Sequence, residues 1–161
     1  GAIELINWSS DNFDRVKEAI KNSDVVINLI GILYETRKQK FKDIHIGIPD
    51  AVSKICAETD VKKFINFSAI GASENSKSIY QRSKFQGEFE ALKNFKNTVI
   101  IRPSVVCGTE DNFTNLFSKL SFLPIIPVVG INYKFQPILV TDVADAIMQA
   151  IESKNNEEKI Y

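Results

Sequence analysis

The sequence is poor in the residues from which metal sites are built. It contains one histidine, His45, and two cysteines, Cys56 and Cys107, without metal-ligand spacing. We therefore expect no metal site, and we interpret the cysteines as small buried side chains that suit a reducing compartment. The chain also lacks an excess of charge of either sign, because 20 basic residues balance 20 acidic ones. Nucleic acid is therefore not expected as a partner. No apolar run is long enough for a membrane span.

The chain's 161 residues fit one domain, and segments with strand and helix patterns alternate along it. This alternation predicts an α/β fold with a parallel sheet and helices on both faces. Pro49 lies inside a helical pattern and predicts a kink or a restart there. Thr141 is expected to cap the last helix, with Ser9, Ser10 or Asp11 capping the first. The expected strands are 3–6, 24–30, 63–68, 98–102, 134–140 and one beginning at 159–161; the helices are 13–20, 41–59, 80–95, 111–120 and one from 141, with an irregular loop at 124–130.

The most informative stretch joins the strand that ends at Ser68 to a helix that opens with Tyr80 and Lys84. Residues four apart share a helix face, so Tyr80 and Lys84 are expected to point the same way. An ammonium close to a phenol favours the phenolate and lowers the tyrosine pKa. The Ser68 hydroxyl could bind the same substrate oxygen. The three residues predict an acid-base site for a carbonyl or alcohol, although an exposed helix start gives the same Tyr-x-x-x-Lys spacing.

Five motifs, in their order along the chain, resemble those of the extended and atypical short-chain dehydrogenases/reductases. The segment Gly31-Ile-Leu-Tyr-Glu35, with Gln39, Phe41 and His45, is similar to the branch that contains the NAD(P)H-binding accessory subunit of respiratory complex I and its bacterial relatives. The resemblance implies a Rossmann-like, doubly wound parallel sheet. The five motifs are Asn28-Leu-Ile-Gly31, Ser68, Tyr80-x-x-x-Lys84, Arg102-Pro-Ser-Val-Val-Cys-Gly108 and Phe135-Gln-Pro-Ile-Leu-Val-Thr-Asp-Val-Ala144.

The resemblance also implies a cofactor, NAD or NADP, and a small carbonyl or alcohol substrate. Catalysis would use Ser68, Tyr80 and Lys84, and residues 109–140 would contribute to the substrate side. His45 lies where many relatives have an asparagine of the catalytic hydrogen-bond relay, and we expect a structural role for it. Complex I subunits are implied as partners, in the bacterial cytoplasm or in an organelle matrix at the periphery of the inner membrane. The implied cofactor-binding residues are Asn28, Leu29, Ile30, Gly31, Lys84, Pro103, Val105 and Val106.

The chain has only seven glycines, and no two of them are close enough to form the glycine-rich turn with which this family holds a pyrophosphate. The sequence begins where the family's third strand would be. We therefore expect residues 1–161 to be a partial NAD(P)-binding domain from a longer protein, lacking the first two strands of the fold. Dinucleotide binding is expected to be weakened or lost.

Three functions remain open at this point. The first is an NAD(P)-binding oxidoreductase or epimerase. The second is a non-catalytic structural or assembly subunit that is stabilised by a bound nucleotide. The third is a degraded remnant without activity.

Overall fold

A computed structural model of the chain describes residues 3–6, 13–111, 115, 135–153 and 159–161. The chain divides into two compact units. The first comprises Gly1–Arg102 together with Ser153–Tyr161, and the second comprises Pro103–Glu152. Each unit is described separately below.

The first unit is built on a parallel sheet of three strands: β1 (Val25–Asn28), β2 (Lys63–Phe67) and β3 (Thr98–Ile101), in the order β1-β2-β3. The central strand β2 is buried almost throughout, as expected for an apolar run in a parallel sheet. The predicted strand start near the C-terminus is confirmed by a parallel bridge between Ile160 and Ile100. All carboxyl ends of the three strands meet at one edge of the sheet, where ligands bind in open α/β folds.

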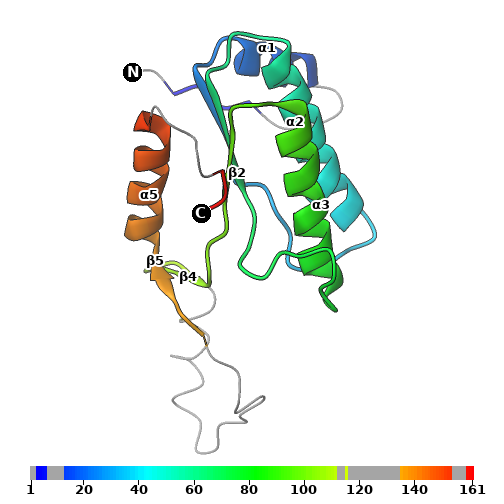
Figure 1. Cartoon of the computed structure of the whole chain (residues 1–161), viewed down its shortest axis with the longest axis vertical. Coiled ribbons are helices and arrows are strands. Elements are labelled where there is room, and N and C mark those ends of the chain that lie inside the picture. Colours follow the sequence, from blue (N-terminus) through cyan, green and yellow to red (C-terminus); the bar gives the residue numbers. More distant parts are fainter. Residues whose placement is uncertain (1–2, 7–12, 112–114, 116–134, 154–158) are drawn as a thin grey trace, which may run out of the picture. The chain divides into compact units, whose positions relative to one another are not determined.

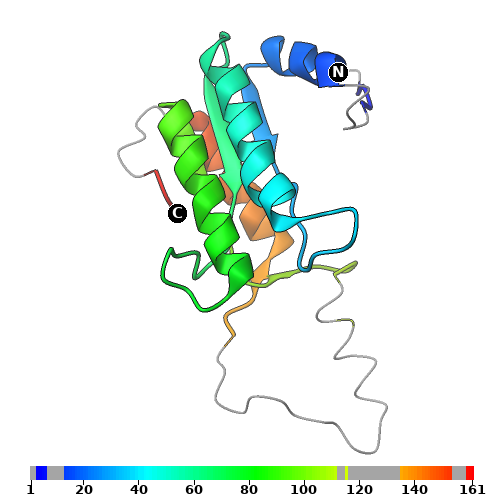
Figure 2. The ribbon, with the colours of Figure 1, turned by 90° about the vertical axis from the view of Figure 1, so that its right-hand side faces the viewer.

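Three α-helices and a π-helical turn accompany this sheet (Figure 1): α1 (Phe13–Lys21), η2 (Lys42–Gly47), α2 (Ile48–Ala57) and α3 (Ile79–Asn94). The restart predicted at Pro49 is confirmed, because α2 begins at Ile48 with the proline in its first turn, where a missing N–H costs no hydrogen bond. The π-helical geometry of the preceding turn was not predicted. Figure 2 shows α2 and α3 side by side over one face of the sheet.

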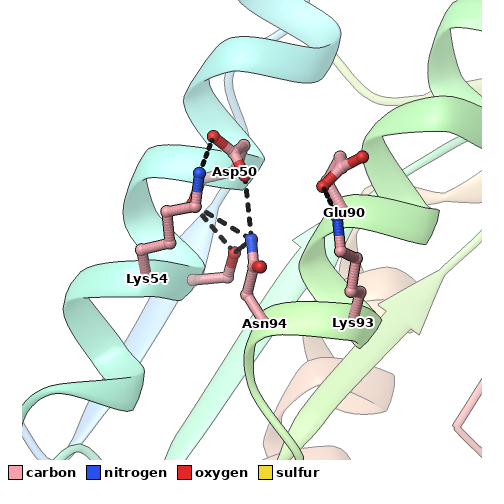
Figure 3. A network of polar contacts seen from close by, with 6 residues as sticks. Asp50, Lys54, Glu90, Lys93 and Asn94 are labelled. Carbon is pink, nitrogen blue, oxygen red and sulfur yellow. Dashed lines mark hydrogen bonds and ion pairs between the residues drawn. The ribbon is translucent and has the colours of Figure 1, made fainter.

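Apolar side chains from α1, α2 and α3 pack with those of β2 and β3 in one buried cluster that includes Val16, Val52, Phe64, Ala91 and Ile100. A polar network at its rim joins α2 to α3 (Figure 3). The side-chain amide of Asn94 donates to Asp50 Oδ1 at 2.9 Å and to Ser53 Oγ at 3.2 Å. Asp50 also pairs with Lys54 at 2.7 Å.

The predicted strand at residues 3–6 was wrong, because this segment forms no strand. Ile3 and Leu5 are 90% and 92% exposed. Among the described residues, no strand pairs with this segment. An extended backbone without a partner strand forms no hydrogen bonds of a sheet, and its N–H and C=O groups are instead hydrogen-bonded by water.

The second unit contains a short parallel pair, β4 (Val106–Cys107) with β5 (Ile138–Leu139), and the helix α5 (Val140–Glu152). Thr141 was expected to cap this helix but lies inside it, because α5 follows β5 directly and begins at Val140. The predicted strand at 134–140 is reduced to two residues. The predicted helix at 111–120 and loop at 124–130 fall almost entirely outside the described residues, as do the candidate caps Ser9, Ser10 and Asp11.

Candidate functional site

The carboxyl ends of β1 and β2 are joined by a buried pair of asparagines. Asn28 Nδ2 donates to Asn66 Oδ1 at 2.8 Å, and Asn28 Oδ1 accepts the Ile30 N–H at 3.1 Å. The Asn28 side chain therefore fixes both the register of the strand ends and the first turn of the loop toward Gly31. Sequence reasoning had assigned Asn28 to the site but missed Asn66. The available signal was a polar residue in an otherwise apolar buried strand.

Lys84 projects from α3 toward the same edge of the sheet and is 8% exposed. Its ammonium donates to the Phe67 carbonyl at 2.9 Å. A Cβ added to Gly31 would lie 3.2 Å from Lys84 Nζ, so the glycine permits close contact between the loop after β1 and the ammonium. Burial lowers the pKa of Lys84, and the charge of Glu88 partly offsets this. The structure therefore brings together Lys84 and Gly31, as expected for a shared site.

Ser68 follows the last residue of β2, and its N–H donates to the Ile101 carbonyl at 2.8 Å. Its hydroxyl is buried and has no hydrogen-bond partner among the described residues. A buried polar group without a partner costs about 1–3 kcal/mol, so such groups are rare in folded proteins. The neighbouring carbonyl, that of Phe67, is the one that holds Lys84. An unsatisfied hydroxyl beside an anchored ammonium is consistent with a site that is completed by a polar ligand atom.

Tyr80 lies in the first turn of α3 and is half-buried. Its ring meets those of His45 and Phe41 edge to face, at centroid distances of 5.3 and 6.0 Å. Burial raises the pKa of Tyr80, whereas the sequence predicted a lower value. Loss of water around the phenol disfavours the phenolate, and the Lys84 ammonium is bound to a carbonyl. Among the described residues, no hydrogen bond joins the Tyr80 hydroxyl to Ser68 or Lys84, so their shared oxygen site stays a prediction.

His45 lies in the π-helical turn and is 2% exposed. Its Nε2 accepts the Ile32 N–H at 3.0 Å, and its Nδ1 lies 2.9 Å from Ser83 Oγ. The ring stacks on Phe41 at a centroid distance of 4.9 Å. Burial, together with the charge of Lys84, lowers the pKa of His45 to about 4. The expectation of a hydrogen-bonded structural histidine is confirmed, and Ser83 is a site residue that the sequence analysis missed.

Behind the site, a buried ion pair joins α3 to the residue that follows β3. Arg102 Nε donates to Glu88 Oε1 at 2.8 Å, and Nη2 binds the second carboxylate oxygen. Glu88 is 2% exposed. A two-point contact of this kind holds both groups in one orientation. Sequence reasoning missed this pair, because the two residues lie on different elements and their spacing in the sequence matches no helix or strand repeat.

The remaining predicted cofactor residues are not brought into this cluster by the geometry described here. Leu29 and Ile30 belong to the loop after β1 and are 64% and 40% exposed. Pro103, Val105 and Val106 belong to the second unit, so their part in the site stays a prediction. Both cysteines are free and buried. In the parts of the chain that the structure describes, no cluster of acidic, histidine or cysteine side chains could hold a metal ion, and no helix could cross a membrane.

Comparisons with solved structures show the fold. The UDP-glucuronic acid 4-epimerase of Bacillus cereus, solved with NAD, superimposes with a TM-score of 0.71 at 20% identity over 90% of this chain and 55% of that one. A dTDP-4-dehydrorhamnose reductase of Clostridium acetobutylicum gives 0.70 at 17% identity over 85% of this chain and 55% of that one. The chain therefore shares the Rossmann-like α/β fold of these two proteins, as predicted.

Comparisons with curated sequences confirm the narrower resemblance, although no family model matches the chain. Subunit 9 of the NADH dehydrogenase [ubiquinone] 1 alpha subcomplex, mitochondrial, from Mus musculus is 36% identical over 163 residues, with 100% of this chain and 43% of that protein covered. The Dictyostelium discoideum subunit is 33% identical, with 100% and 45% covered. The 40 kDa subunit of NADH-ubiquinone oxidoreductase from Neurospora crassa is 31% identical, with 100% and 42% covered. The chain thus spans less than half the length of these relatives.

Proposed function

We propose that this chain forms the carbonyl and ribose side of an NAD(P)-dependent site of the short-chain dehydrogenase/reductase type. The observation that carries the proposal is the Ser68 hydroxyl, which is buried next to the peptide that anchors Lys84 and finds no hydrogen-bond partner in the part of the chain that the structure describes. In this first candidate function, the protein is an oxidoreductase or epimerase that acts on a small carbonyl or alcohol. This agrees with the predicted roles of Ser68, Tyr80 and Lys84.

The residues present fit part of a dinucleotide. Because Gly31 has no side chain, its backbone lies close to the Lys84 ammonium, which has three donors and donates, among the described residues, to the Phe67 carbonyl alone. Asn28, Leu29, Ile30 and Gly31 would line the cofactor. Residues 1–161 contain no glycine-rich turn that would bind the pyrophosphate.

A bound nicotinamide supplies hydride transfer. Tyr80 would give a proton to the substrate oxygen in reduction or take one in oxidation. Ser68 would donate a hydrogen bond to the same oxygen and hold it in position. Lys84 would hold the ribose and favour the charged form of Tyr80 once the ligand displaces its bond to the Phe67 carbonyl.

Calorimetry of the 161-residue chain with NADH and with NADPH tests the binding part of this proposal. We expect binding weaker than micromolar for both, because the pyrophosphate site is incomplete. Lys84→Ala should weaken the binding further, whereas Tyr80→Phe should leave it nearly unchanged, because the substitution keeps the ring that packs against His45 and Phe41. Micromolar affinity for either dinucleotide would contradict the importance of the glycine turn. Equal affinity in wild type and Lys84→Ala would contradict the proposal that Lys84 binds the dinucleotide.

A second candidate is a structural or assembly subunit whose bound nucleotide stabilises the protein without turnover. The similar subunits of NADH dehydrogenase favour it, and so does the raised pKa of Tyr80, which does not prepare a base. The partners would then be complex I subunits, in an organelle matrix or a bacterial cytoplasm, at the periphery of the inner membrane. Nucleotide should raise the thermal midpoint of wild type and Tyr80→Phe alike, with no oxidoreductase rate for the substitution to reduce. A remnant would show neither effect.

A further inference from the structure

We propose that His45 is a positioning residue that ties the Gly31–Ile32 backbone to α3 and thereby sets the position of the Lys84 ammonium relative to the loop after β1. The arrangement of hydrogen bonds and close backbone contacts carries this inference. It rests on the proposed function only for the identity of the ligand, a dinucleotide.

The direction of each hydrogen bond around His45 follows from counting protons. The Ile32 N–H can only donate, so Nε2 of the histidine must carry a lone pair. Ser83 has one hydroxyl proton, and it is donated to the Tyr80 carbonyl at 2.7 Å. The Ser83 oxygen must then accept from His45 Nδ1–H. The neighbours therefore select one neutral tautomer, with a donor toward α3 and an acceptor toward the loop.

The backbone of His45 also lies in close contact with α3. A Cβ placed on Gly87 of α3 would lie 1.8 Å from the His45 carbonyl oxygen, so only a glycine allows α3 to approach the π-helical turn this closely. The ring is further fixed by its stack on Phe41. The imidazole is thus a rigid link of defined length between α3 and the loop.

This link reaches the place where the loop meets Lys84. A Cβ on Gly31 would lie 3.2 Å from Lys84 Nζ and 3.7 Å from His45 Nε2, so both side chains contact the same glycine. Apolar burial gives the loop little support, because Leu33 and Tyr34 are 80% and 73% exposed. The hydrogen bond from Ile32 to His45 is therefore a main restraint that keeps the loop against the ammonium. Its loss should let the loop move and admit water to Lys84.

Three substitutions separate the two ends of the link. His45→Gln keeps an acceptor near the position of Nε2, His45→Asn keeps a donor near Nδ1, and His45→Phe keeps the aromatic ring but neither polar atom. Hydrogen exchange of the Ile32 amide should be about tenfold faster in His45→Phe and His45→Asn, and within a few-fold of wild type in His45→Gln. The Ile65 amide in β2 is the control, and its unchanged protection would show an intact sheet.

Two spectroscopic measurements extend the test to the site itself. Nitrogen NMR of the wild-type imidazole should show the Nδ1–H tautomer at neutral pH. The pKa of Lys84, followed by NMR, should rise toward its ordinary value in His45→Phe but not in His45→Gln, because water reaches the ammonium only when the loop leaves it. The opposite tautomer, an Ile32 exchange rate unaffected by His45→Phe, or an unchanged Lys84 pKa in that variant would each overturn the proposal.

NADH titration separates this inference from the proposed function. If the wild-type chain binds NADH, His45→Phe should weaken the binding at least several-fold, and His45→Gln should restore most of it; equal affinities would overturn the positioning role. If the wild-type chain binds no NADH at millimolar concentration, the binding proposed for residues 1–161 fails, whereas the positioning role of His45 does not. The link between His45, the loop and Lys84 is then judged by the exchange and titration results alone.

Discussion

Replacing Gly87 with alanine is expected to destabilise the protein, although alanine is the better helix former. In a helix interior alanine is favoured over glycine by about 1 kcal/mol. Against this, the new Cβ would lie 1.8 Å from the His45 carbonyl oxygen, where real Cβ contacts shorter than 3.0 Å are essentially never seen. The helix α3 would have to move by more than 1 Å, because the neighbouring atom belongs to the backbone and cannot rotate away as a side chain could. Overpacking of this kind costs about 1–3 kcal/mol and occasionally more.

We therefore expect Gly87→Ala to lower the free energy of unfolding by up to about 2 kcal/mol net, or the thermal midpoint by up to roughly 8 °C for a chain of this length. Urea unfolding followed by circular dichroism measures it. Gly47→Ala is the matched control, because Gly47 has helical angles and its added Cβ meets only a carbonyl at 3.5 Å, an ordinary contact. That variant should be as stable as wild type or more so. A Gly87→Ala protein at least as stable as wild type would refute the close approach of α3 to the π-helical turn.

Three further predictions follow from buried groups. Arg102→Ala should cost about 3–5 kcal/mol of stability in urea unfolding because it leaves the buried Glu88 side chain without its partner, and Arg102→Lys, which loses the two-point contact, should recover only part of it. The pKa of His45 is lower in the folded than in the unfolded protein, so the unfolded state binds more protons between about pH 6.5 and 4. The free energy of unfolding should therefore fall by about 3 kcal/mol as the pH drops through this window. His45→Gln should lack this pH-dependent loss. Burial raises the pKa of the Cys56 thiol to about 11, so a thiol reagent at pH 8 should modify it only on unfolding; rapid labelling of the native protein would contradict its burial.

The sequence was sufficient to predict the framework that places the site. Ser68 at a strand end and Lys84 on the following helix were predicted from an apolar run and a four-residue spacing, and both are properties of a local segment. The restart at Pro49 was likewise predictable, because one residue's chemistry determines it. The strand at 3–6 was predicted from its local pattern but failed, since a strand needs a partner and the pattern contains no information about one.

The contacts that the sequence did not reveal all join residues far apart in the chain. His45 and Ser83 are 38 residues apart, as are Asn28 and Asn66, and no periodicity marks such pairs. The π-helical turn escaped prediction because it spans only six residues, Lys42–Gly47, which are too few for its period to be distinguished from that of an α-helix. The direction of the Tyr80 pKa shift was predicted wrongly for a related reason: spacing indicated a nearby ammonium but not the burial of the phenol.

Burial acts in the same sense on every titratable side chain of the site, and this constrains its chemistry. It raises the pKa of Tyr80 and lowers the pKa values of His45 and Lys84, so each group is shifted toward its neutral form. At neutral pH Tyr80 is then a phenol and His45 a neutral imidazole. A phenol whose pKa is raised gives up its proton less readily than an exposed tyrosine, and in its neutral form it does not remove one. If the site is catalytic as proposed, proton transfer through Tyr80 in either direction would therefore require a bound ligand that brings the Lys84 ammonium to the phenol.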